Sequence, residues 1–372
     1  MNFIHLHIHT VARHIGLQRR CHLRHSRRRH SGLAERSHRS RRDDGGGDNN
    51  GGDLPPPHVL LGFGVSVAGA TAASVYAYRS CLDNVPYTNR SRLLATSPQW
   101  EANVGHEQYS ELLEMHRGRI LPDGHRAAVT VRRVGSRIAA AAERCSREWT
   151  ANGSNVRGGA STATPTYTYT VIRSEDANAF VLPGNHVFVL TGLFRYVRDE
   201  DELASVLGHE MAHNLARHAG ERASETILLA MLRRLALVVD PSGTLLALLI
   251  PAGALLCTLP HSREHEMEAD RIGMILAGEA CYDPRAAGRV FSRMRDDDGG
   301  GGVGGSRNSP PPEWISTHPG YDARLSQFDR WMPEALERFN LDGGSKCRSI
   351  REEMKRARRL AAEIHDGQGR RT

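Results

Sequence analysis

The segment 199–220, DEDELASVLGHEMAHNLARHAG, constrains this chain more than any other because it combines helical periodicity with a cluster of polar groups. Its four leading acidic residues suit the positive end of a helix dipole. His209 and His213 are four positions apart, so a helix presents both imidazoles on one face. Glu210 lies beside them, where it can hold a metal-bound water molecule. The spacing predicts a helix with two zinc ligands and the general base of a metallopeptidase.

A catalytic zinc needs a third protein ligand and an open position for water. The segment EHEMEAD contains Glu264, Glu266, Glu268 and Asp270. On a helix, Glu266 and Asp270 share one face, so that one carboxylate would bind the metal and the other would accept the second N–H of a ligand histidine. Glu264 and Glu268 form a competing pair, and a solvated acidic helix face is the simpler alternative.

His218 follows His213 by five positions. If the helix continues through both, its rotation carries His218 well away from the face of His209 and His213. We therefore expect His218 to be a surface or packing histidine. The same interpretation applies to His261 and His265, although they flank the third candidate ligand.

The segments before this helix predict both helices and strands. Residues 100–147 are charged and largely helical in pattern, and Val129, Val131, Val134, Ile138 and Ala141 fall roughly on one helical face. TYTYTVIRS (166–174) and AFVLPGNHVFVLTGLF (179–194) are typical of strands, and the Pro-Gly-Asn triplet at 183–185 predicts a hairpin turn.

Two apolar runs, Ile227–Val239 and Thr244–Leu259, follow the histidine segment and are separated by DPSG. Each is short for a membrane span, so buried or interfacial helices are favoured over a hairpin that enters a membrane. The six cysteines form no CxxC pair and are too sparse for a disulfide scaffold or a cysteine zinc site. Whether any of them pair stays open.

The basicity of the chain is concentrated at its N-terminus. Residues 1–42 hold eleven arginines, one acid and no lysine, whereas the other residues have 38 basic and 41 acidic side chains, a net charge of −3. An arginine-rich, acid-poor N-terminus is typical of a mitochondrial or plastid transit peptide. The alternative is a basic arm that binds nucleic acid, but no nucleic-acid motif accompanies it, so we expect no nucleic-acid partner.

The region after the arm contains a candidate membrane helix. Val59–Tyr78 is uncharged, rich in small residues and about long enough to span a bilayer, although a buried Gly/Ala-rich helix is the alternative. The expected organisation is a transit peptide (1–42), a linker (43–57), a transmembrane helix (58–79), a metallopeptidase domain (80–340) with a Gly/Pro-rich insertion (296–312), and a charged, solvated tail (341–372).

Three motifs in order, LGHEMAHNLARH, SREHEMEADRIG and STHPGYDARL, resemble the gluzincin metallopeptidases related to the CaaX prenyl endopeptidases. VPYTNRSRLLATSP (85–98) and AFVLPGNHVFVLTGLF also resemble the mitochondrial inner-membrane Oma-type proteases of that group. The resemblance covers roughly residues 85–340. It implies an α+β fold, with a mostly helical peptidase domain and a small sheet whose edge strand binds substrate, next to an N-terminal membrane helix.

The resemblance also implies the roles of individual residues. His209, His213 and Glu266 would bind one Zn²⁺ per subunit, Glu210 would be the general base, and Asp270 would orient His209. His318 would lie near the zinc, either steadying the oxyanion or occupying the metal in a resting state, and Arg324 would be an ion-pair partner. The implied substrate edge strand consists of His186, Val187, Phe188, Val189, Leu190 and Thr191.

The implied activity is hydrolysis of peptide bonds by a membrane-anchored zinc endopeptidase in inner-membrane protein quality control. Its substrates would be inner-membrane proteins, and the resemblance allows a homo-oligomer. A plastid membrane is the alternative location. A catalytically silent membrane scaffold or chaperone on the same fold is the alternative function, which the intact Glu210 argues against.

Overall fold

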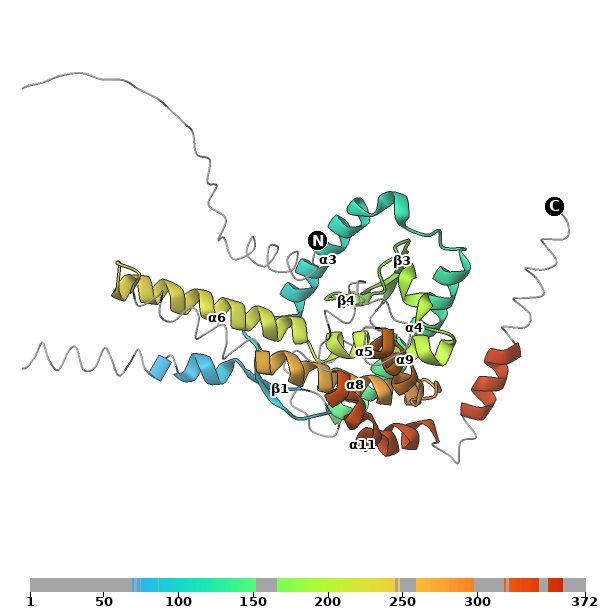
Figure 1. The fold of residues 1–372 in the computed structure, drawn as a ribbon. Helices are drawn as coiled ribbons and strands as arrows, with labels where there is room; N and C mark the ends of the chain where they lie inside the picture. Colours follow the sequence, from blue (N-terminus) through green and yellow to red (C-terminus); the bar gives the residue numbers. More distant parts are fainter. Residues whose placement is uncertain are drawn as a thin grey trace, which may run out of the picture. The chain divides into compact units, whose positions relative to one another are not determined.

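The computed structural model describes residues 75–85, 87–151, 166–244, 259–297, 318, 321–340 and 347–356, together with positions 69, 72, 73 and 247. The described residues divide after Ser80 into two compact units, and every helix and strand that is labelled below belongs to the unit that begins at Cys81 (Figure 1). The predicted transit peptide and linker, and most of the predicted insertion, lie outside the described residues.

The membrane helix predicted at 58–79 is described only in part, and residues 75–80 are helical. Within the part of the chain that the structure describes, no helix combines the length and the apolar character that crossing a membrane requires.

Two helices precede the main sheet, as the periodicity of 100–147 predicts. α3 spans Pro98–Met115, and its first turn is capped by Ser97, whose side chain accepts a hydrogen bond from the Trp100 amide. α4 spans Arg126–Ala151 and buries Val131, Val134, Ile138 and Ala141 in the core. Val129, in contrast, is 42% exposed, so it does not belong to this face.

The main sheet contains three strands in the order β3-β5-β4. β3 (Thr168–Ile172) runs parallel to β5 (His186–Leu190), and β4 (Ala179–Leu182) forms the predicted hairpin with β5. At the turn, Gly184 and Asn185 have φ angles of 84° and 69°, which glycine and asparagine tolerate better than most residues.

The prediction that His186–Thr191 is the substrate-binding edge strand is wrong. β5 is the central strand, because β3 and β4 occupy its two sides, and Thr191 already begins the 3₁₀ helix η2 (Thr191–Arg195). All five residues of β5 are buried, which agrees with the lack of apolar–polar alternation in HVFVL.

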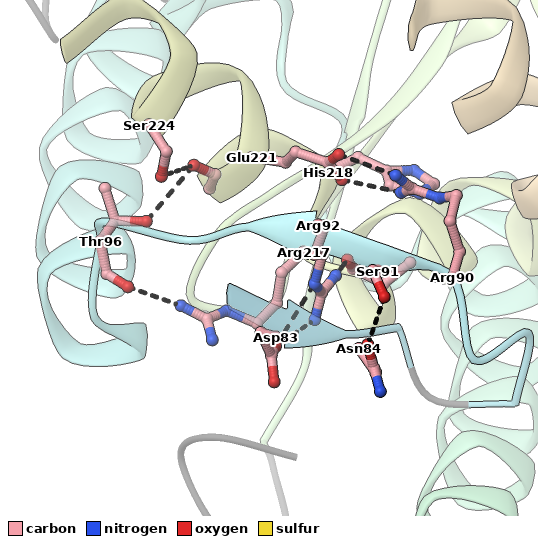
Figure 2. A network of polar contacts seen from close by, with 12 residues as sticks. Asp83, Asn84, Arg90, Ser91, Arg92, Thr96, Arg217, His218, Glu221 and Ser224 are labelled. Atoms are coloured by element: carbon pink, nitrogen blue, oxygen red, sulfur yellow. Dashed lines mark hydrogen bonds and ion pairs between the residues drawn. The ribbon is translucent and has the colours of Figure 1, made fainter. Parts of the chain in front are cut away.

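A second, two-stranded sheet lies near the start of the same unit. β1 (Leu82–Asn84) pairs antiparallel with β2 (Ser91–Leu93). Arg92 is buried and donates a hydrogen bond to Asp83, as Figure 2 shows. It also donates to the carbonyl of Ala216, which follows the helix that contains His209 and His213. Arg92 therefore connects the β1–β2 hairpin to the segment that follows His213.

Two helices at the centre of the unit approach each other unusually closely. α5 spans Glu200–Leu215 and α8 spans Leu259–Glu279, and they lie side by side (Figure 1). A Cβ on Gly208 would lie 2.8 Å from the Gly273 oxygen, and a Cβ on Gly273 would lie 2.8 Å from the His209 nitrogen. Only glycine at both positions lets the two backbones touch. α9 (Ala286–Asp297) and α11 (Tyr321–Phe339) pack around this pair.

α6 (His218–Val239) contains the first predicted apolar run. Seven large apolar side chains of that run are exposed: Leu228, Met231, Leu232, Leu235, Leu237, Val238 and Val239. The run is therefore not a buried helix, and an interfacial role stays a prediction. Most of the second run lies outside the described residues.

A disulfide connects Cys281, just after α8, to Cys347, across 66 positions of the sequence. Residues 347–356 are helical, and Cys347 and Met354 are both buried against the body. The prediction of a solvated tail is thus wrong for this segment, because a covalent bond and apolar contacts hold it in place.

Candidate metal centre

α5 brings the HExxH residues together in the buried part of the unit. Asp199 caps the helix by accepting a hydrogen bond from the Glu202 amide, which sets where the helix begins. One turn separates the two histidines, and His209 Nε2 and His213 Nε2 face each other at 3.1 Å. Glu210 is buried beside them.

α8 supplies two carboxylates, Glu266 and Asp270, that contact the two nitrogens of His209. Glu266 Oε2 lies 3.4 Å from His209 Nε2, and Asp270 Oδ1 lies 2.9 Å from His209 Nδ1. Glu266 Oε1 also lies 3.5 Å from His213 Nε2. Asp270 is therefore placed where it accepts a hydrogen bond from His209, as predicted. Of the competing pair, Glu264 is exposed and Glu268 contacts other residues.

His318 and Arg324 complete this buried group. His318 Nδ1 lies 2.8 Å from Glu266 Oε2 and 3.4 Å from His209 Nε2, and His318 Nε2 lies 3.4 Å from Glu210 Oε1. Arg324 forms a two-bond ion pair with Asp270, at 2.7 and 2.8 Å, and donates to the His318 carbonyl at 3.0 Å. The arginine thus links His318 to Asp270 of α8.

The distances from His209 Nε2 to the other candidate ligand atoms are close to those around a tetrahedral zinc ion. Bonds of about 2.0–2.1 Å at a tetrahedral angle place two ligand atoms about 3.3–3.4 Å apart. The distances from His209 Nε2 to its counterparts on His213, Glu266 and His318 are 3.1, 3.4 and 3.4 Å. One ligand atom from each of these four residues lies within 4.8 Å of all the others.

The hydrogen bonds around the group explain why it suits a cation. Because Asp270 accepts from His209 Nδ1, the neutral ring of His209 keeps a lone pair on Nε2, pointing at His213 and Glu266. Three electron-rich groups therefore converge, which is unfavourable unless a proton or a metal ion lies among them.

Without a metal, protons take that role. Burial lowers the pKa of His209, but hydrogen bonds to Asp270 and Glu266 outweigh it and raise the pKa to about 9. Burial also opposes ionisation of Glu266, yet His318 and His213 hold its pKa well below the usual value. For His213, burial dominates and lowers the pKa well below that of a free imidazole. The residues therefore favour an anionic Glu266 and a neutral His213.

His218 is buried and lies outside the group of candidate ligand atoms, which agrees with the predicted packing role, but the sequence did not predict its contact with His213. α5 ends at Leu215, and Arg217 has a φ of 54°, so the chain leaves the helical path before His218 begins α6. His218 is fully buried, and its Nδ1 lies 2.8 Å from His213 Nδ1. No glycine or proline marks the end of α5 in the sequence. Extending the helix through His218 therefore gave the wrong orientation for this side chain.

Two further residues lie beside His218: His265, which the sequence predicts to be a surface or packing histidine, and Glu268, from the competing acidic pair. The His265 ring stacks on His218 with 4.2 Å between ring centroids, so His265 packs against a polar partner inside the protein. Glu268 Oε2 accepts a hydrogen bond from His218 Nε2 at 2.9 Å. The sequence names Glu268 as part of the competing i, i+4 pair. It does not show that Glu268 binds His218, because the position of His218 depends on the change of chain direction at Arg217.

The first residue of β5 makes other contacts. His186 Nε2 lies 2.6 Å from His106 Nδ1, and His186 Nδ1 lies 2.7 Å from the Thr168 hydroxyl. Asn214, in the last turn of α5, donates to Asn185 in the β4–β5 turn at 2.7 Å. The hairpin is therefore tied to the helix of the candidate ligands through its turn.

Comparisons with known proteins agree with this geometry. The profile of peptidase family M48 matches residues 150–332. The chain is 35% identical over 274 residues to the mitochondrial metalloendopeptidase OMA1 of Schizosaccharomyces pombe, covering 73% of this chain and 72% of that protein. It is 29% identical to OMA1 of Saccharomyces cerevisiae over 73% and 74% of the two chains, and 36% identical to human OMA1 over 45% and 32%.

Proposed function

The chain belongs to peptidase family M48, with the OMA1 metalloendopeptidases, and is itself a metalloendopeptidase; we propose that it uses one Zn²⁺ ion per subunit. The observation that carries the choice of zinc is the convergence of two imidazoles and one carboxylate at tetrahedral spacing. Two nitrogens and one carboxylate oxygen are a ligand set that catalytic zinc commonly has.

In this proposal His209, His213 and Glu266 hold the metal. Asp270 fixes His209 with Nδ1 protonated and Nε2 directed at the metal. Arg324 neutralises Asp270 and keeps that carboxylate pointing at the imidazole, since it binds both of its oxygens. Truncating Arg324 would therefore weaken metal binding through Asp270.

Bound zinc would polarise the scissile carbonyl and make a water molecule nucleophilic near neutral pH. Glu210 would accept a proton from the attacking water on its carboxylate and pass it to the leaving amine. His318, with Nε2 3.4 Å from Glu210, lies where a donor can stabilise the developing oxyanion. Its Nδ1 also lies among the candidate ligand atoms, so His318 would be able to bind the metal in a resting enzyme.

β4 is the strand on which we propose that substrate binds. It lies beside α5, and among the described residues no strand pairs with its outer side. Three of its residues, Phe180, Val181 and Leu182, are partly exposed. An extended peptide can therefore add to this edge through backbone hydrogen bonds, next to the candidate metal ligands.

The cellular setting follows from the relatives that are named mitochondrial. We place the protein at the mitochondrial inner membrane, with residues 1–42 as the transit peptide and 58–79 as the membrane anchor. Its substrates would be inner-membrane proteins that require quality control. Homo-oligomerisation is part of the same proposal.

The experiment that tests this function compares the wild-type chain with Glu210→Gln. The substitution keeps the shape of the side chain and the metal ligands but removes the base. We expect stoichiometric zinc in both proteins and loss of cleavage of an unfolded protein such as casein in the variant. Unchanged cleavage by Glu210→Gln would refute the proposed chemistry, and a wild-type chain without zinc would refute the metal centre.

A further inference from the structure

A second group of buried ionisable residues lies directly behind the candidate metal centre. The buried members are His218 and Glu221 of α6 and His265 and Glu268 of α8, and the partly buried Thr88 and Arg90 of the β1–β2 turn bind them. Such a group is costly to bury unless every charge has a partner. The proposed reaction uses none of these residues, so their position needs an explanation.

One contact joins this group to the metal centre. His213 faces the candidate ligands through Nε2, and its other nitrogen, Nδ1, lies 2.8 Å from His218 Nδ1. At that distance one of the two nitrogens must carry a proton and the other must accept it. The far nitrogen of His218, Nε2, lies 2.9 Å from Glu268 Oε2.

The carboxylate determines the direction of this chain of hydrogen bonds. An ionised Glu268 can only accept, so His218 Nε2 carries a proton. In a neutral His218 ring, Nδ1 then has only a lone pair, and His213 Nδ1 must be the donor. That leaves the lone pair of His213 on Nε2, the nitrogen directed at His209 and Glu266.

We propose that His218, held by Glu268, is a positioning residue that keeps His213 in the tautomer and ring orientation that bind metal. It does for His213 what Asp270 does for His209: each ligand histidine donates its Nδ1 proton to an acceptor on the side away from the metal. This inference rests on the proposed metal centre.

Several contacts keep Glu268 ionised and in place. Arg90 donates to Glu268 Oε2 from Nε at 3.3 Å and from Nη2 at 3.0 Å, and the Thr88 hydroxyl donates to Oε1. Arg90 also binds both oxygens of Glu221 at 2.8 Å, as Figure 2 shows. A guanidinium on one oxygen and a hydroxyl donor on the other favour a carboxylate that only accepts hydrogen bonds.

The orientation of the His218 ring is also constrained. One face stacks on His265 at an interplanar angle of 16°, and His265 Nε2 lies 3.0 Å from Glu221 Oε2. Arg90 therefore binds Glu221, which contacts the His265 ring that stacks on His218. Arg90 also binds Glu268, which accepts the proton of His218 Nε2. A ring fixed by these contacts presents Nδ1 to His213 with little rotational freedom.

Two substitutions of His218 separate positioning from packing. His218→Phe keeps a flat ring that can stack on His265, but it removes the acceptor. His218→Asn loses the stack, yet its side-chain oxygen can occupy the place of Nδ1 and accept from His213. If His218 acts through packing alone, the Phe variant should bind zinc more tightly than the Asn variant. If His218 positions His213, the Asn variant should bind zinc more tightly than the Phe variant.

The measurement is the Zn²⁺ affinity of the full chain near neutral pH, by competition with a chelator, together with the thermal unfolding of the metal-free chain. Ser224→Ala is the control for lost stability, because Ser224 is buried on the same helix and bonds to the Ala95 amide and the Gly220 carbonyl. We expect His218→Phe to bind zinc about 10- to 100-fold more weakly than wild type. His218→Asn and Ser224→Ala should stay close to wild type in affinity, whatever their unfolding temperatures.

The proposal is overturned if His218→Phe binds zinc as tightly as Ser224→Ala, or if the Asn variant binds as weakly as the Phe variant. A wild-type chain that binds no zinc would instead overturn the metal centre, and the positioning role with it. The two failures are distinguishable because the second is seen in the unmodified protein.

Discussion

The contact between Gly208 and Gly273 makes Gly273→Ala the most informative substitution outside the chemical groups. The two glycines let α5 and α8 touch, and this contact sets how far His209 lies from Glu266 and Asp270. An added methyl group tests whether that separation matters, because it removes no hydrogen bond and no charge.

The structure gives the size of the disturbance. A Cβ on Gly273 would lie 2.8 Å from the His209 nitrogen and 2.9 Å from its Cα, where ordinary contacts begin near 3.4 Å. The helices must therefore separate by about 0.6 Å, and overpacking of this kind typically costs about 1–3 kcal/mol of stability. Ligand distances in a metal site tolerate only about 0.2 Å. We expect the zinc affinity to fall by at least about tenfold.

The assay measures zinc affinity by chelator competition and stability by denaturant unfolding of the metal-free chain. The matched control is Gly288→Ala in α9, where an added Cβ meets nothing within 4 Å. That control should raise stability by up to about 1 kcal/mol, since alanine is the better helix former, and should leave the zinc affinity unchanged. If Gly273→Ala binds zinc like the control, close contact of the helices does not set the ligand spacing.

Three further predictions concern the third ligand, the titration of the empty site and the disulfide. Glu266→Ala should lose stoichiometric zinc, whereas Glu264→Ala, on the exposed side of the same helix, should keep it; the reverse result would show that the wrong face of α8 was assigned. In the metal-free chain the pKa of His209 is raised to about 9, so its contribution to stability is complete below pH ~6.5 and is lost as the pH rises through 9. Unfolding of metal-free protein at several pH values should show this loss and Asp270→Asn should reduce it, while a flat profile in the wild type would contradict it. Cys281→Ser opens a loop of 66 positions and should cost at most about 4 kcal/mol, seen as a lower unfolding temperature that reductant no longer changes.

Local features of the chain could be predicted from the sequence because their causes are local. His209 and His213 share a face through the period of the helix, and Asp199 marks where that helix begins. The Pro-Gly-Asn triplet predicted the hairpin of β4 and β5 because its Gly and Asn accept positive φ angles. Glu266 and Asp270 were paired by the same helical period, and both face His209.

Features that depend on which segments meet could not be predicted in this way. HVFVL is consistent with any buried strand, and only the order β3-β5-β4 shows that it is central and that β4 carries the edge. The contact of Cys281 with Cys347 likewise depends on where the last described segment folds back.

The sequence by itself thus placed His209, Glu210 and His213 of the candidate metal centre on one helix, because helical spacing is a property of neighbouring residues. Only the tertiary structure decided which residues contact those side chains from other parts of the chain. The left-handed Arg217, held by an ion pair to Glu101, turns His218 back toward His213, and the glycine contact brings α8 against α5. Both depend on contacts between residues far apart in the chain, which no local pattern encodes.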